Sequence, residues 1–132
     1  MAAGDFAPGL DEIERLARAA LARIPEPFAS HLPDIILAVE DWPSRELLND
    51  MGIADPYELT GLYEGRPVGE KSVDDFATLP DRIFLFRRPL LDEWAETGVS
   101  LPDLVNHVVV HEVGHHFGLS DEQMEAIERS ME

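Results

Sequence analysis

The chain has 132 residues, and this length predicts a single domain spanning residues 1–132 with one hydrophobic core. Its 27 acidic and 10 basic residues give a formal net charge of −17, which repels phosphate backbones and anionic lipids, so we expect no nucleic acid and no membrane partner. The absence of cysteine excludes disulfides and thiolate metal ligands, and a start without the features of a signal peptide makes the cytoplasm the expected location.

The first half of the chain predicts two helical segments and two strands. An amphipathic helix is predicted over residues 11–24, because apolar side chains recur there at helical spacing and two prolines follow. The apolar run at residues 35–39 predicts a buried strand. A helical turn is predicted over residues 45–51, closed by Gly52, and a second strand over residues 59–64.

Residues 66–80 are predicted to form an irregular loop, and residues 82–87 the next strand. The strand is rich in β-forming residues and lies between prolines. Arginines stand at both of its ends, and charges of this kind often protect an exposed strand from further pairing. We therefore predict that residues 82–87 form an edge strand.

Two helices are predicted at the end of the chain. The first spans residues 101–117, with Ser100 as its N-cap and Gly118 as its left-handed terminator. The second begins after Ser120, which forms a capping box with Gln123. Helices and strands in this order indicate an α+β fold in two layers.

The sequence His111-Glu112-Val113-Gly114-His115 lies on the first of these two helices. Residues four apart on a helix are about 40° apart around its axis and about 6 Å apart along it, so both imidazoles can converge on one metal ion. Glu112 lies beside this line and is predicted to act as a general base rather than as a ligand. With no cysteine available, a set of histidine and carboxylate ligands favours zinc.

The third metal ligand is predicted to be Asp121, which follows the chain reversal at Gly118. An acid in the first turn of a helix is also favoured by the helix dipole alone, so Glu125, one turn further, stays open as the alternative ligand. His116 is predicted to face solvent or support a ligand, and His107 to pack above the site or, as the less favoured alternative, to orient a ligand.

Several other residues are predicted to have structural roles. His31 lies in loop sequence, Tyr63 and Glu64 belong to a strand and its turn, and Met124 is expected to be part of the core. Tyr63 has a hydroxyl that could donate to an oxyanion, but its position does not follow from the sequence.

The spacing His111-Glu112-x-x-His115-x-x-Gly118-x-x-Asp121 resembles the extended motif of zincin metallopeptidases, in the variant with Asp as third ligand. Over roughly residues 10–130 the chain is similar to small bacterial zincin-like proteins, through residues 61–65, 82–90 and 110–118. This resemblance implies a minimal zincin-like fold, in which a small, twisted, mostly antiparallel sheet packs on helices and the motif helix lies near the C-terminus. The methionine turn of larger metzincins has no counterpart here.

These features predict a zinc metallopeptidase that acts on a peptide or protein substrate. The metal would lower the pKa of its bound water, and Glu112 would take the water's proton and pass it to the leaving amine. Residues 83–87 would bind the peptide by strand addition. The alternative is a non-catalytic binding module with a structural or absent metal, because so short a chain leaves little to wall a deep cleft.

Overall fold

The computed structural model describes residues 7–65 and 81–131. The predicted loop at residues 66–80 lies outside them. In chain order the elements are α1 (Leu10–Arg23), the 3-10 helix η2 (Ala29–Asp34), β1 (Ile36–Glu40), α2 (Arg45–Met51), the 3-10 helix η3 (Pro56–Glu58), β2 (Gly61–Glu64), β3 (Arg82–Phe86), α3 (Arg87–Thr97), α4 (Leu101–Phe117) and α5 (Asp121–Ser130). This mixture of helices and a small sheet confirms the α+β prediction.

The sheet has the strand order β1-β3-β2, so β3 is its central strand. It pairs in parallel with β1 and antiparallel with β2. The expected antiparallel character therefore holds for one of the two pairings.

The prediction that residues 82–87 form an edge strand is wrong, because β3 is paired on both sides. Its burial agrees with a central position, since Ile83 and Leu85 are both 0% exposed. The arginines stand where the chain enters and leaves the sheet. Arg87 begins α3 and donates hydrogen bonds to the carbonyl of Pro8 at 2.6 Å and to the carboxylate of Asp41 at 3.1 Å. The arginines at the ends of β3 therefore do not protect a free strand edge from further pairing.

The first strand, β1, is an edge strand and is less buried than predicted. Leu37 is its buried residue, whereas Ile36 is 44% exposed. An apolar run is compatible with burial on both faces, but only the face of β1 toward the helices is well covered. The sequence pattern alone does not separate these two cases.

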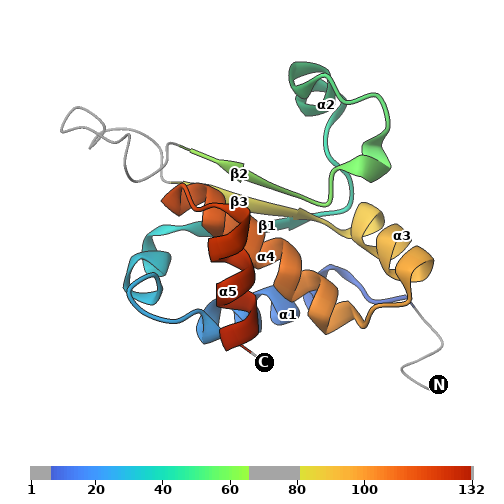
Figure 1. The fold of residues 1–132 in the computed structure, drawn as a ribbon. Helices are drawn as coiled ribbons and strands as arrows, with labels where there is room; N and C mark the ends of the chain where they lie inside the picture. The colour runs from blue at the N-terminus through green and yellow to red at the C-terminus, as the bar shows by residue number, and fades with distance from the viewer. Residues whose placement is uncertain (1–6, 66–80, 132) are drawn as a thin grey trace.

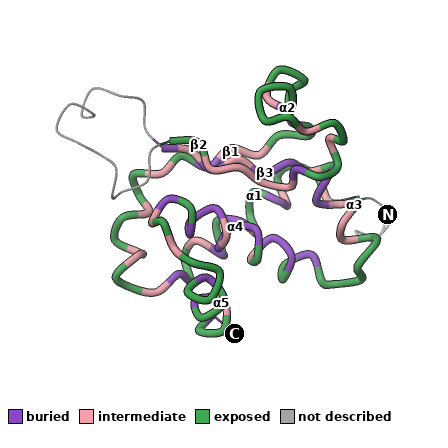
Figure 2. The backbone as a smooth tube through the Cα atoms, turned by 45° about the horizontal axis from the view of Figure 1, so that its top comes forward, coloured by how far each residue is buried: buried purple, intermediate pink, exposed green. Residues whose placement is uncertain are grey.

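Helices α1 and α4 pack together on one side of the sheet, with α5 against α4 (Figure 1). Helix α4 contacts α1, α3, α5, β2 and β3, and buried residues follow one another along most of its length (Figure 2). Its Val105, Val109 and Val110 are all 0% exposed. This central helix therefore supplies much of the core and also carries the predicted metal-binding motif.

The predicted ends of the last two helices are confirmed. Ser100 Oγ accepts from the backbone N–H of Asp103 at 3.3 Å, and Gly118 has the left-handed φ of 67°. In the capping box before α5, Ser120 Oγ accepts from the Gln123 N–H at 3.2 Å, and Gln123 Oε1 accepts from the Ser120 N–H at 2.8 Å. Local hydrogen bonding thus fixes the length of α4 and the start of α5.

Helix α3 does not follow from the sequence pattern, in which Pro89 indicates the end of a strand. Pro89 in fact lies in the first turn of α3, where the missing amide hydrogen costs nothing. Gly98, with φ 72°, ends the helix in the left-handed conformation. Within residues 7–65 and 81–131, no helix is both long enough and apolar enough to cross a bilayer.

Gly114 allows α5 to pack closely against α4. A Cβ atom at position 114 would lie 2.1 Å from Met124 Sδ and 2.6 Å from Met124 Cγ. These separations are far shorter than van der Waals contact, and Met124 is buried. The absence of a side chain at this position therefore sets the distance between the two helices.

We predict that Gly114→Ala destabilises the protein by about 1–3 kcal/mol, although alanine is the better helix former. The new methyl group would overlap the Met124 side chain. Urea unfolding of Gly114→Ala, Met124→Ala and the double variant measures the coupling. The double variant should be less destabilised than the sum of the single variants. A stabilised Gly114→Ala protein, or strict additivity, would contradict the proposed overlap.

Candidate metal centre

The motif residues lie in the last two turns of α4, close to β2. His111 is half-buried, Glu112 is 7% exposed, and the side chain of His115 is 56% exposed. Asp121 is exposed at the start of α5, just after the chain reverses at Gly118. The helix boundaries thus place all four predicted site residues around the C-terminal end of α4.

Glu112 is held by groups from both α4 and β2. Its carboxylate lies 3.1 Å from His115 Nδ1 and accepts a hydrogen bond from the backbone N–H of Tyr63. Burial raises the pKa of Glu112, while His115 and the Tyr63 amide oppose this shift. A carboxyl group with a raised pKa is better suited to accept and return a proton near neutral pH.

Gly61 allows β2 to pass directly over Glu112. A Cβ atom at this position would lie 2.6 Å from Val108 Cγ1 and 3.3 Å from Glu112 Oε2. Any larger residue would push the strand away from α4. Gly61 therefore helps the sheet to cover the Glu112 carboxylate.

The outer edge of β2 lies next to this carboxylate. The N–H of Phe86 donates to the carbonyl of Thr60 at 2.9 Å, and these residues face each other in the antiparallel register. Hydrogen-bonded pairs alternate along such a ladder, so the main-chain groups of Gly61 and Tyr63 point away from β3. This agrees with the hydrogen bond from Tyr63 to Glu112. The strand edge beside the candidate centre therefore belongs to β2, and the prediction that residues 83–87 fill that role is wrong.

His111 lies within the electrostatic reach of four other titratable side chains. Burial lowers the pKa of His111, with further lowering by His107 and His115, whereas Glu128 and Asp121 oppose it. A lowered pKa favours the neutral imidazole, which is the form that binds metals. The predicted role of Asp121 as third ligand stays a prediction.

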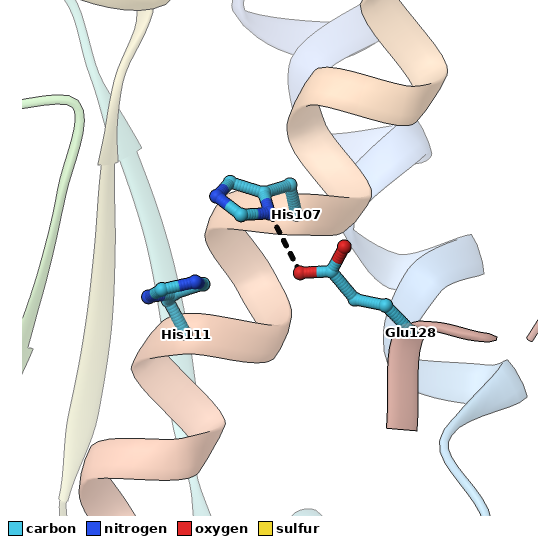
Figure 3. Close-up of side chains that lie close together, drawn as sticks. All are labelled: His107, His111 and Glu128. Atoms are coloured by element: carbon cyan, nitrogen blue, oxygen red, sulfur yellow. Dashed lines mark hydrogen bonds and ion pairs between the residues drawn. The ribbon is translucent and has the colours of Figure 1, made fainter. Parts of the chain in front are cut away.

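A second arrangement of ligands was not predicted. His107, His111 and Glu128 each offer one ligand atom, and these three atoms lie within 4.8 Å of one another (Figure 3). Among the described residues, this is the group of three or more potential metal ligands whose ligand atoms lie this close together. It includes neither His115 nor Asp121. His115 instead turns its Nδ1 toward Glu112. The set of His111, His115 and Asp121 therefore stays a prediction, as does Glu125 as the alternative ligand.

His107, predicted to pack above the site or to orient a ligand, is half exposed and pairs with a residue of α5. Its side chain is 51% exposed, and its Nδ1 lies 2.6 Å from Glu128 Oε1 on α5. The spacing of His107 and His111 is visible in the sequence, but the approach of Glu128 depends on how α4 and α5 pack. No local sequence signal indicates this pairing.

His116 is buried rather than exposed to solvent. It is 4% exposed, and its Nδ1 lies 3.1 Å from the hydroxyl of Tyr63 and 3.0 Å from Asp81 Oδ2. Asp81, just before β3, is also 4% exposed. These polar contacts join α4 to β2 and to the start of β3, directly beside the candidate centre.

The potential ligand atoms around the end of α4 are of the types that bind zinc. They are imidazole nitrogens and carboxylate oxygens, which zinc accepts in protein sites. The buried, proton-accepting Glu112 lies beside them. This arrangement could support metal-assisted hydrolysis.

We predict that His116→Ala destabilises the protein by about 3 kcal/mol, because the buried Asp81 carboxylate loses its imidazole partner. Tyr63→Phe should cost only about 1 kcal/mol, because it removes one neutral hydrogen-bonding group. Urea unfolding measures both changes. Adding Asp81→Asn to His116→Ala should recover part of the loss. Equal destabilisation by His116→Ala and Tyr63→Phe would show that the lost contact with Asp81 is not the cause.

We predict that Glu112→Gln stabilises the metal-free protein increasingly as the pH rises. Because folding raises the pKa of Glu112, its stabilising contribution is full below the unfolded pKa and is lost as pH rises through the folded pKa. The glutamine side chain of the variant does not titrate, although its oxygen still accepts from the Tyr63 amide. Melting temperatures measured in chelator from about pH 4 to pH 7 test this. The advantage of the variant should widen toward pH 7, and a constant difference would contradict it. Glu122→Gln, at an exposed position of α5, is the matched control.

A scan against protein-family models matches residues 32–131 to the zincin-like metallopeptidase family. A search of curated proteins found no match. The matched region includes the whole sheet, the motif on α4 and all of α5. The chain therefore belongs to the zincin-like metallopeptidase family.

Proposed function

We propose that the protein is a zinc-dependent metallopeptidase in which Glu112 is the general base. The observation that carries this proposal is the buried Glu112 carboxylate, which lies between the motif helix and the outer edge of β2. In a member of a metallopeptidase family, this places a proton acceptor next to a strand edge that an extended peptide can join.

His111, His115 and Asp121 are the residues that would hold the zinc ion. Bound there, zinc would supply Lewis acidity to a water molecule and to the scissile carbonyl. His111 and His115 are one helical turn apart on α4, and Asp121 begins the following helix. His115 contacts Glu112 through Nδ1, so its Nε2 would be the nitrogen available to the ion, and its side chain is 56% exposed.

Glu112 would move the proton during hydrolysis. Its carboxylate would accept a proton from the attacking water and return it to the leaving amine. The Tyr63 amide fixes the position of this carboxylate, and burial makes its protonated form more accessible than that of an exposed glutamate.

The substrate would be a peptide or protein segment in extended conformation. The outward main-chain groups of β2 would pair with it, in the manner of an added strand. Within the described residues β2 has a strand partner on only one side, which is β3. The substrate would then lie along β2 with its scissile bond near Glu112.

We predict that Glu112→Ala retains about one zinc ion per chain but loses peptide hydrolysis by about 10²–10⁴-fold. Elemental analysis and cleavage of a peptide library by zinc-loaded protein measure the two properties. The control is Glu122→Ala, an exposed acid on α5, which should retain both.

Two outcomes would contradict the proposal. Full hydrolysis by Glu112→Ala would remove Glu112 from the mechanism. Absence of any cleavage by the zinc-loaded wild-type protein, with chelation lowering its melting temperature, would favour a binding module with a structural metal.

A further inference from the structure

His107, His111 and Glu128 form a compact group. His111 is also one of the predicted zinc ligands, whereas His107 and Glu128 are not. The imidazole rings of His107 and His111 have their centroids 4.4 Å apart, and His107 Nδ1 lies 2.6 Å from Glu128 Oε1. Figure 3 shows both histidines on the same face of α4, with Glu128 reaching across from α5. The three side chains therefore converge from two helices.

This geometry is close to what a metal ion requires. Nitrogen and oxygen ligands about 2.0–2.1 Å from a tetrahedral zinc ion are separated from one another by about 3.3 Å. Each of the three residues has a ligand atom within 4.8 Å of the other two. Small side-chain rotations would thus be enough to enclose an ion, which would take the place of the present contact between His107 Nδ1 and Glu128 Oε1.

The surroundings of the group would attract a cation and let it enter. A groove of about 640 Å³ is lined by His107 and Glu128 and by the acidic residues Glu93 and Asp103. Arg23 is the basic residue in this lining, and its guanidinium donates to Asn106 Oδ1 at 3.0 Å. The net charge of −17 adds a general attraction for cations.

We propose that His107, His111 and Glu128 form a second site for a divalent metal ion of the zinc class. This inference goes beyond the proposed peptidase function, because binding at this site does not depend on hydrolysis. Since His111 belongs to both ligand sets, an ion bound here takes His111 away from His115 and Asp121. Occupancy of the two sites would therefore be coupled.

The test uses a full-length variant without the other predicted ligands. His115→Ala combined with Asp121→Asn keeps His107, His111 and Glu128. Calorimetric titration with Zn²⁺ should show one ion bound per chain, and Co²⁺ should give the visible absorption of a low-symmetry site with nitrogen and oxygen ligands.

Adding either His107→Gln or Glu128→Gln to this background should weaken Zn²⁺ binding at least tenfold. Adding Glu122→Gln or His31→Ala should leave it unchanged, because neither residue belongs to the group. Circular dichroism establishes that each variant is folded, and using two independent ligand variants keeps the test decisive if one of them unfolds.

Two results would overturn the proposal. One is that the background variant binds no Zn²⁺. The other is that His107→Gln and Glu128→Gln change only its melting temperature, which would mark their contact as an ordinary ion pair between helices. Hydrolysis by the wild-type protein and its loss in Glu112→Ala are measured separately, so failure here leaves the proposed peptidase function standing.

Discussion

The close contact between β2 and α4 is the constraint on which the candidate centre depends. Gly61 has no side chain, so the strand passes within contact distance of Val108 and of the Glu112 carboxylate. That approach buries Glu112, brings the Tyr63 amide to it, and sets the outer edge of β2 beside the motif. The burial of Glu112, its hydrogen bond and the position of β2 thus depend on the close approach of Gly61 to Val108 and Glu112.

Features set by neighbours in the chain were predictable from the sequence. Ser100 and Gly118 delimit α4, and Ser120 with Gln123 begins α5, because each uses hydrogen bonds to the backbone within a few residues. The H-E-x-x-H spacing likewise needs only helical geometry. Residues His111, Glu112 and His115 could therefore be placed on one helix end before any tertiary contact was known.

Features set by packing between elements were not predictable in this way. The arginines flanking β3 resemble the charges of an edge strand, yet β1 and β2 both pair with it. His116 follows the exposed His115 in the sequence, but it points inward, where its Nδ1 contacts Asp81 and the Tyr63 hydroxyl. Glu128 meets His107 across two helices. Each of these outcomes depends on partners 18 or more residues away, about which local periodicity says nothing.

Because α4 supplies both the core and the motif, the position of α5 matters for both ligand sets. Most of α4 is buried, whereas its His107 and His115 side chains are about half exposed, and α5 packs against the same helix. The Gly114–Met124 contact holds α5 close, and α5 carries Asp121 in its first turn and Glu128 two turns later. A shift of α5 along α4 would therefore move both carboxylates relative to His111 at once.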